Sequence, residues 1–143
     1  MGRTALALSL ALAAGCTDSK PYPDLPEKNL KVMTVTAGGR VALEVHSLGE
    51  GCTRKYEGFV ALDRPLIELG LPADRASLLV FEFHRGGLLP ADTPIKKEVQ
   101  ALPRAGNRYE LRVAYKDSIH DIELREIDLR AGTDREIDTR RRC

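Results

Sequence analysis

The 143-residue sequence contains no tryptophan, and aromatic residues make up only 5% of it. Binding sites for nucleic-acid bases and for sugar rings depend on such side chains, so neither kind of site is expected. Net charge is also nearly absent, because 22 basic and 21 acidic residues are interleaved and leave a balance of +1. The sequence therefore predicts neither a polybasic face for nucleic acid nor a charge-driven partner.

The sequence also lacks an apolar run of the ~20 residues that a membrane-spanning helix needs. Its N-terminal apolar run, TALALSLALAA from Thr4 to Ala14, has 11 residues (4 to 14) and follows the basic Arg3. A basic start, a run of this length and a final "AAG" of small residues are typical of a cleaved secretory signal. We therefore expect residues 1–15 to be a signal peptide.

Cys16 follows this run directly, and a small residue followed by cysteine resembles the lipobox of bacterial lipoproteins. The resemblance covers residues 1–16 and implies cleavage before Cys16, a diacylglycerol on its sulfur and a further acyl chain, such as palmitate, on the new amino terminus. The family most often has leucine three residues before the cysteine, where this chain has Ala13. The alternative is an ordinary secretory signal that leaves Cys16 as a free or paired thiol.

Acylation of Cys16 would decide where the protein is held. Each buried methylene contributes ~0.8 kcal/mol, so two or three acyl chains hold a small protein on its membrane permanently. In the lipoprotein family an aspartate after the cysteine tends to retain the protein at the inner membrane, and here that residue is Thr17. The resemblance therefore implies an outer-membrane lipoprotein of the cell envelope that faces the periplasm.

Three prolines, Pro21, Pro23 and Pro26, punctuate the polar segment that follows. Prolines block helix and sheet hydrogen bonds and favour an extended chain. Residues 16–29 are therefore predicted to form a tether, which at ~3 Å per residue would span up to roughly 40 Å. The alternative is an irregular arm along the edge of the domain.

Residues 30–143 carry the period-two pattern of half-buried strands. The predicted strands are Leu30–Ala37, Arg40–Leu48, Tyr56–Leu62, Pro65–Leu69, Leu78–Arg85, Ile95–Leu102, Arg108–Lys116, Ile119–Leu129 and Arg135–Thr139. Turns rich in glycine and proline separate them, which predicts one all-β domain, an antiparallel β-sandwich of about seven to nine short strands, with a small β-barrel as the alternative. A shift in the apolar phase within Ile119–Leu129 predicts a bulge near Arg125.

One stretch of this domain carries a second resemblance. PLIELGLPADRASLLVFEF, residues 65–83, resembles the strand, turn and strand around "GLP" in transthyretin-like and carboxypeptidase-regulatory-like domains. The resemblance implies the same β-sandwich class.

The sequence has only three cysteines. With Cys16 acylated, Cys52 and Cys143 are the two thiols that remain in an oxidising compartment, and we expect them to form a disulfide. The bridge would close a loop of 143 − 52 = 91 positions, which stabilises by up to ~4 to 5 kcal/mol in the chain-entropy model. The alternatives are a free terminal thiol and an intermolecular bridge.

The histidines, His46, His84 and His120, show no metal-binding or catalytic spacing. They lie on separate predicted strands, and none has a histidine partner at the i, i+2 or i, i+4 spacing of a zinc site. His120 lies beside Asp117 and Asp121, which is interpreted as a polar turn, with a small cation site as the alternative.

Carboxylate pairs such as Glu123 and Glu126 are interpreted as the solvated face of a sheet, and no GxSxG motif is present. We therefore expect no enzyme, no cofactor, no metal and no small-molecule substrate. In the alternative that the chain is an enzyme, catalysis would require one of the three histidines.

The expected function is that of a lipid-anchored, non-catalytic binding or accessory domain that contacts another envelope or secretion-machine protein. The loop Arg85–Pro94 carries Leu88 and Leu89 beside two glycines and is the candidate contact surface. The alternative for this loop is that both leucines pack against the rim of the core. The alternative function is a periplasmic inhibitor or immunity lipoprotein directed against a lytic enzyme or toxin.

Overall fold

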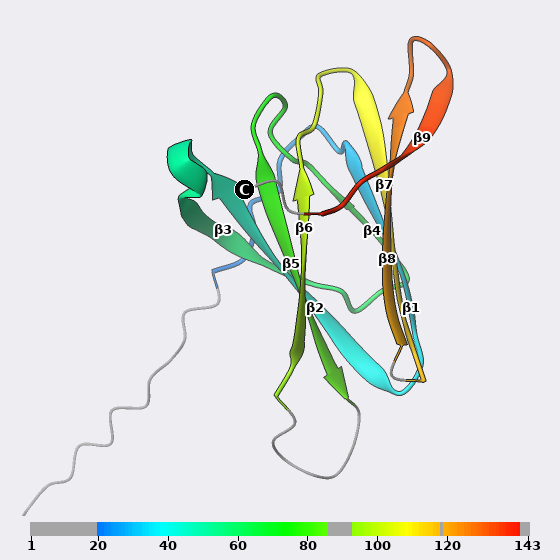
Figure 1. The fold of residues 1–143 in the computed structure, drawn as a ribbon. Coiled ribbons are helices and arrows are strands. Elements are labelled where there is room, and N and C mark those ends of the chain that lie inside the picture. Colours follow the sequence, from blue (N-terminus) through cyan, green and yellow to red (C-terminus); the bar gives the residue numbers. More distant parts are fainter. Residues whose placement is uncertain (1–19, 86–92, 118, 141–143) are drawn as a thin grey trace, which may run out of the picture.

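A computed structural model describes residues 20–85, 93–117 and 119–140 (Figure 1). These residues form nine β-strands and one short 3-10 helix, so the predicted all-β class is confirmed. The elements are β1 (Leu30–Thr36), β2 (Gly39–Leu48), η1 (Glu50–Cys52), β3 (Arg54–Ala61), β4 (Leu66–Leu69), β5 (Ser77–Arg85), β6 (Ile95–Ala101), β7 (Asn107–Lys116), β8 (Ile119–Asp128) and β9 (Thr133–Ile137). Each predicted strand is present.

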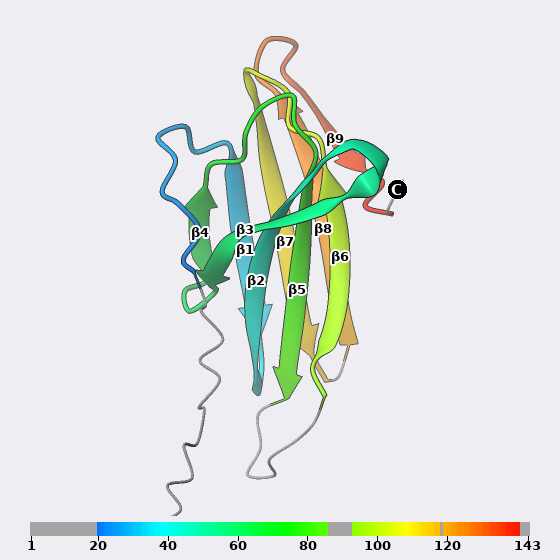
Figure 2. The ribbon, with the colours of Figure 1, turned by 90° about the vertical axis from the view of Figure 1, so that its left-hand side faces the viewer.

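The strands form two sheets that pack face to face as a β-sandwich (Figures 1 and 2). One sheet has the strand order β4-β1-β7-β8-β9, and the other has the order β3-β2-β5-β6. All neighbouring strands are antiparallel except β1 and β7, which run parallel with Leu30 opposite Tyr109. A parallel pair needs a crossover connection, and here the chain forms β2 and β3 of the second sheet, β4 of the first, and β5 and β6 of the second before β7 returns beside β1. The five-stranded sheet is therefore a mixed sheet, with one parallel pair among antiparallel ones.

Alternate side chains of the two facing sheets fill the core. Leu43 and Phe81 of one sheet and Leu111 and Leu124 of the other are fully buried. Each such side chain contributes ~1.5 to 3 kcal/mol on burial. The residues between them, such as Ala42 on β2, point away from the core, as the period of a strand requires.

The phase shift in β8 has a different cause from the predicted bulge. β8 pairs with β7 in unbroken register, so the bulge predicted near Arg125 is wrong. Instead, Glu126 takes the inward-facing position after Leu124 and is only 4% exposed. The register of the other sheet does shift, between Val45 and His46 of β2 where it pairs with β3.

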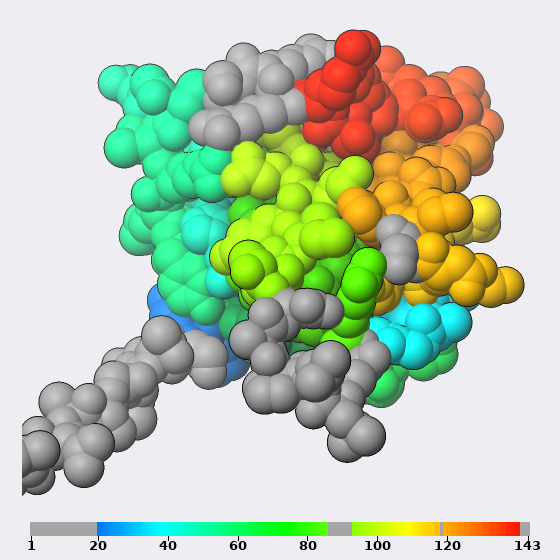
Figure 3. Space-filling model, turned by 60° about the horizontal axis from the view of Figure 1, so that its bottom comes forward, coloured from blue at the N-terminus to red at the C-terminus, as the bar shows by residue number. Residues whose placement is uncertain are grey.

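Residues 20–29 lie along the domain as an arm. Pro21 forms an isolated parallel bridge with Phe59 of β3. The amide of Tyr22 donates a hydrogen bond to the carbonyl of Phe59 at 2.8 Å, and the amide of Phe59 donates to the carbonyl of Lys20 at 2.8 Å. Figure 3 shows the start of this arm, in blue, against the sandwich.

Two further contacts hold the arm. The Tyr22 hydroxyl donates to the carbonyl of Gly70 at 2.8 Å. The buried Asn29 side chain donates to the carbonyl of Leu71 and accepts from its amide, both at 2.7 Å. Residues 20–29 therefore form the irregular arm along the domain edge that was the alternative to a tether. The prediction of a tether over residues 16–29 is wrong for this part.

Candidate binding groove

Four of the predicted site residues, Cys16, Leu88, Leu89 and Cys143, lie outside the described residues. Acylation of Cys16 and a contact role for Leu88 and Leu89 therefore stay predictions.

Cys52 is the remaining predicted site residue. It ends η1, where its backbone is left-handed with φ of 62°, and it is half-buried. Both other cysteines of the chain lie outside the described residues, so the predicted disulfide of Cys52 stays a prediction. Its pairing with Cys143 in particular stays a prediction, because Cys16 is the other candidate.

A groove of about 530 Å³ lies on the four-stranded sheet beside β3. Ala42 of β2 lies directly opposite Ala61 of β3, and both line the groove and carry only a methyl group, which leaves space between the larger side chains around them. These two residues point away from the core, since their strand neighbours Val41 and Leu43 are buried. The remaining lining residues are Thr36, Gly39, Arg40, Val41, Phe59, Leu62, Asp63, Glu82 and His84.

The groove is lined by both apolar and charged residues. Phe59 and Leu62 supply the apolar side near β3, and β5 supplies Glu82 on the other side. Glu82 forms an ion pair with Lys96 of β6 and lies 3.5 Å from the Nε2 atom of His84. The hydrogen bond to Glu82 raises the pKa of Lys96 above its usual value. The carboxylate of Glu82 is therefore balanced by a permanent positive charge, and the groove carries no strong excess of either sign.

The three histidines lie apart. His46 and His84 occupy opposite ends of the β2–β5 pair, and His120 lies on β8 of the other sheet. The His46 Nε2 atom lies 3.1 Å from a carboxylate oxygen of Glu44, while the His120 ring packs against Phe83 with centroids 5.4 Å apart. Within residues 20–85, 93–117 and 119–140, no three His, Cys, Asp or Glu side chains are placed to hold a metal ion.

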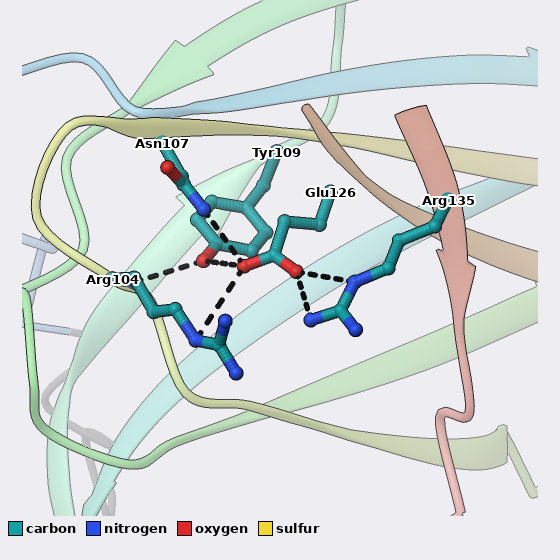
Figure 4. Close-up of polar contacts among 5 residues, drawn as sticks. All are labelled: Arg104, Asn107, Tyr109, Glu126 and Arg135. Atoms are coloured by element: carbon teal, nitrogen blue, oxygen red, sulfur yellow. Dashed lines mark hydrogen bonds and ion pairs between the residues drawn. The ribbon is translucent and has the colours of Figure 1, made fainter. Parts of the chain in front are cut away.

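Glu126 was predicted to lie on a solvated face, and this prediction is wrong. Figure 4 shows its carboxylate enclosed by side chains from β7, β9 and the turn before β7. One oxygen accepts hydrogen bonds from the Tyr109 hydroxyl at 2.8 Å and from Asn107 Nδ2 at 3.0 Å. The other oxygen accepts from Arg135 Nε at 2.7 Å, and Arg104 Nε lies 3.9 Å from the first.

Two opposing effects act on this buried carboxylate. Burial raises the pKa of Glu126, but the hydrogen bonds from Tyr109, Arg135 and Asn107 together lower it below its usual value. Glu126 is therefore charged at neutral pH and joins β7, β8 and β9 at one edge of the sandwich. The sequence signal that could have found it is its position, two residues after the buried Leu124 on the same face of the strand.

No family model, no curated protein and no solved structure matches this chain. The fold and the groove define the class of the molecule as a β-sandwich domain with an open groove beside one edge strand. Among the residues that the structure describes, none belongs to a helix long and apolar enough to span a membrane.

Proposed function

We propose that this chain is a lipid-anchored, non-catalytic binding domain of the cell envelope. The apolar run and the small residues before Cys16 support acylation at its sulfur. Thr17 after the cysteine supports the outer membrane, with the sandwich facing the periplasm. In this proposal the domain holds another envelope or secretion-machine protein at the membrane surface.

The groove over Ala42 and Ala61 is the observation that carries the binding role. Protein interfaces combine apolar and polar groups, and here the apolar Phe59 lines the groove together with the charged Arg40 and Asp63. The near balance of charge favours a protein segment of mixed polarity over a nucleic acid, which requires an excess of positive charge. The expected occupant is an exposed segment of the partner protein.

We further propose that Cys52 forms a disulfide with Cys143. The end of β2, which η1 follows, lies at the same end of the sheet as the end of β6. A cavity of about 200 Å³ is lined both by Gln100 of β6 and by Arg140, three residues before Cys143. The chain thus approaches the region of Cys52 as it nears Cys143, which leaves Cys16 available for acylation.

Site-specific photo-crosslinking of the full-length protein in its own envelope tests the binding role. A crosslinker at Ala61 in the groove should capture one envelope protein, and one at Ala114 on the outer face of the other sheet should not. Filling the groove by Ala61→Tyr should abolish capture from a crosslinker at Phe59, whereas Ala114→Tyr should leave it unchanged. Equal capture at both alanines, or none at Ala61, would contradict the groove as the binding site.

The identity of the captured protein separates the two functions. A secretion or assembly subunit supports the accessory role. A lytic enzyme or toxin whose activity is abolished by one equivalent of the domain would replace that role with the inhibitor function.

A further inference from the structure

The point where the chain joins the sandwich is fixed by backbone contacts. Lys20 and Tyr22 exchange hydrogen bonds with Phe59 of β3, both at 2.8 Å. Gly58 makes this approach possible, because a Cβ atom at its position would lie 2.4 Å from the Cα of Tyr22. The first described residue, Lys20, is therefore held against β3.

Little chain separates this point from the proposed lipid. Cys16 and Lys20 are 20 − 16 = 4 positions apart, and a fully extended chain spans at most ~3.3 to 3.6 Å per residue. The two Cα atoms therefore lie within about 14 Å of each other. A lipid on Cys16 would keep the part of the domain around Lys20 close to the bilayer.

The side chains around Lys20 suit a membrane surface. Lys55 of β3 is 74% exposed, and Tyr56 beside it is 36% exposed. The Tyr56 hydroxyl lies 3.4 Å from the carbonyl of Lys20, so Tyr56 lies directly beside the first described residue of the arm. Lysine and tyrosine both place an apolar body and a polar tip at a lipid headgroup layer.

The acidic partner of Lys55, Glu57, is held by a second contact. Glu57 accepts a hydrogen bond from Ser47 at 2.6 Å and lies 3.5 Å from the Lys55 ammonium group. The hydrogen bond from Ser47 is the main cause that lowers the pKa of Glu57. The Lys55 side chain is the more exposed member of this ion pair, at 74% against 23% for Glu57, which favours contact with anionic lipid headgroups.

We infer that the edge formed by Lys20, Lys55 and Tyr56, here called the β3 edge, lies against the lipid headgroups. This inference rests on the proposed acylation of Cys16. Figure 1 shows β3 and β9 on opposite sides of the sandwich, so the β8–β9 hairpin points away from the bilayer. The groove adjoins the β3 edge, and its partner is accordingly a protein segment that lies close to the membrane.

The absence of tryptophan allows a direct test with single-tryptophan reporters. Full-length acylated Tyr56→Trp and Leu129→Trp proteins are bound to vesicles of phosphatidylethanolamine and phosphatidylglycerol that contain brominated lipid. Leu129 is 55% exposed and follows β8, on the far side from β3. The inference predicts loss of fluorescence for Tyr56→Trp and none for Leu129→Trp. Equal quenching, or quenching at Leu129→Trp alone, overturns it.

Two controls complete the design. Lys55→Trp is a second reporter on the β3 edge, at an exposed position where the substitution leaves the core intact, and it should be quenched like Tyr56→Trp. Vesicle flotation of the wild-type chain and of Cys16→Ser tests the anchor separately. A wild-type chain that does not float refutes the proposed anchoring and the orientation with it, whereas one that floats with the wrong quenching pattern refutes the orientation alone.

Discussion

Substitution of Glu126 by glutamine tests whether the buried carboxylate is a charged structural group. The side chain keeps its size, but one oxygen becomes an NH2 group that faces donors. The Tyr109 hydroxyl and the Asn107 amide both donate to Glu126 in the wild-type protein. At least one of these donors, or the guanidinium of Arg135, loses its acceptor in the variant.

The expected cost follows from these contacts. A hydrogen bond to a charged group contributes ~1.5 to 3 kcal/mol. Arg135 is 61% exposed and regains water, so loss of its ion pair adds at most ~1 kcal/mol. We expect Glu126→Gln to lower the free energy of unfolding by about 2 to 3 kcal/mol. Glu123→Gln is the matched control, because Glu123 lies on the same strand with a partly exposed partner, Arg125, and should cost less than ~0.5 kcal/mol.

Urea unfolding of the oxidised domain measures both variants. The midpoint should fall by roughly 1 M for Glu126→Gln and hardly at all for Glu123→Gln. The lowered pKa of Glu126 means that its contribution is present above the pKa of the unfolded chain and is lost on acidification. The difference between wild type and Glu126→Gln should therefore shrink below about pH 4. Equal stability at pH 7, or a difference that grows in acid, would refute the argument.

Three further outcomes are expected. Asn29→Ala should lower the free energy of unfolding by ~1 to 3 kcal/mol, because it leaves a buried amide and a carbonyl of the arm contact unpaired; an unchanged melting temperature would contradict this. Gly58→Ala should displace the arm, and hydrogen exchange should show faster exchange of the Tyr22 amide while the core amides stay protected. Peptide mapping under non-reducing conditions should recover Cys52 joined to Cys143, and a Cys16–Cys52 peptide would count against both the bridge and the lipid.

Strands such as β7 could be predicted because they face water on one side and the core on the other. In β7, Tyr109, Leu111 and Val113 are buried while the residues between them are more exposed, and this alternation is visible in the letters alone. The parallel pairing of β1 with β7 could not be predicted in the same way. Pairing depends on contacts between residues far apart in the chain, for which a local period carries no information.

The site and the arm were harder to predict for chemical reasons. Glu126 occupies a core position only because Tyr109, Asn107 and Arg135 meet its carboxylate, and these partners come from separate strands and turns. The arm has the composition of a flexible linker, yet Tyr22 and neighbouring backbone groups find partners on β3 and beyond. The groove depends on two alanines that meet only in the register of β2 with β3.

The central claim is that acyl chains on Cys16 hold this sandwich at its membrane, and intact-mass measurement of the native protein tests it most directly. The account predicts a chain that begins at Cys16 and carries the mass of a diacylglycerol and a further acyl group. An unmodified chain, or one whose Cys16 sulfur is joined to another cysteine, would contradict the account.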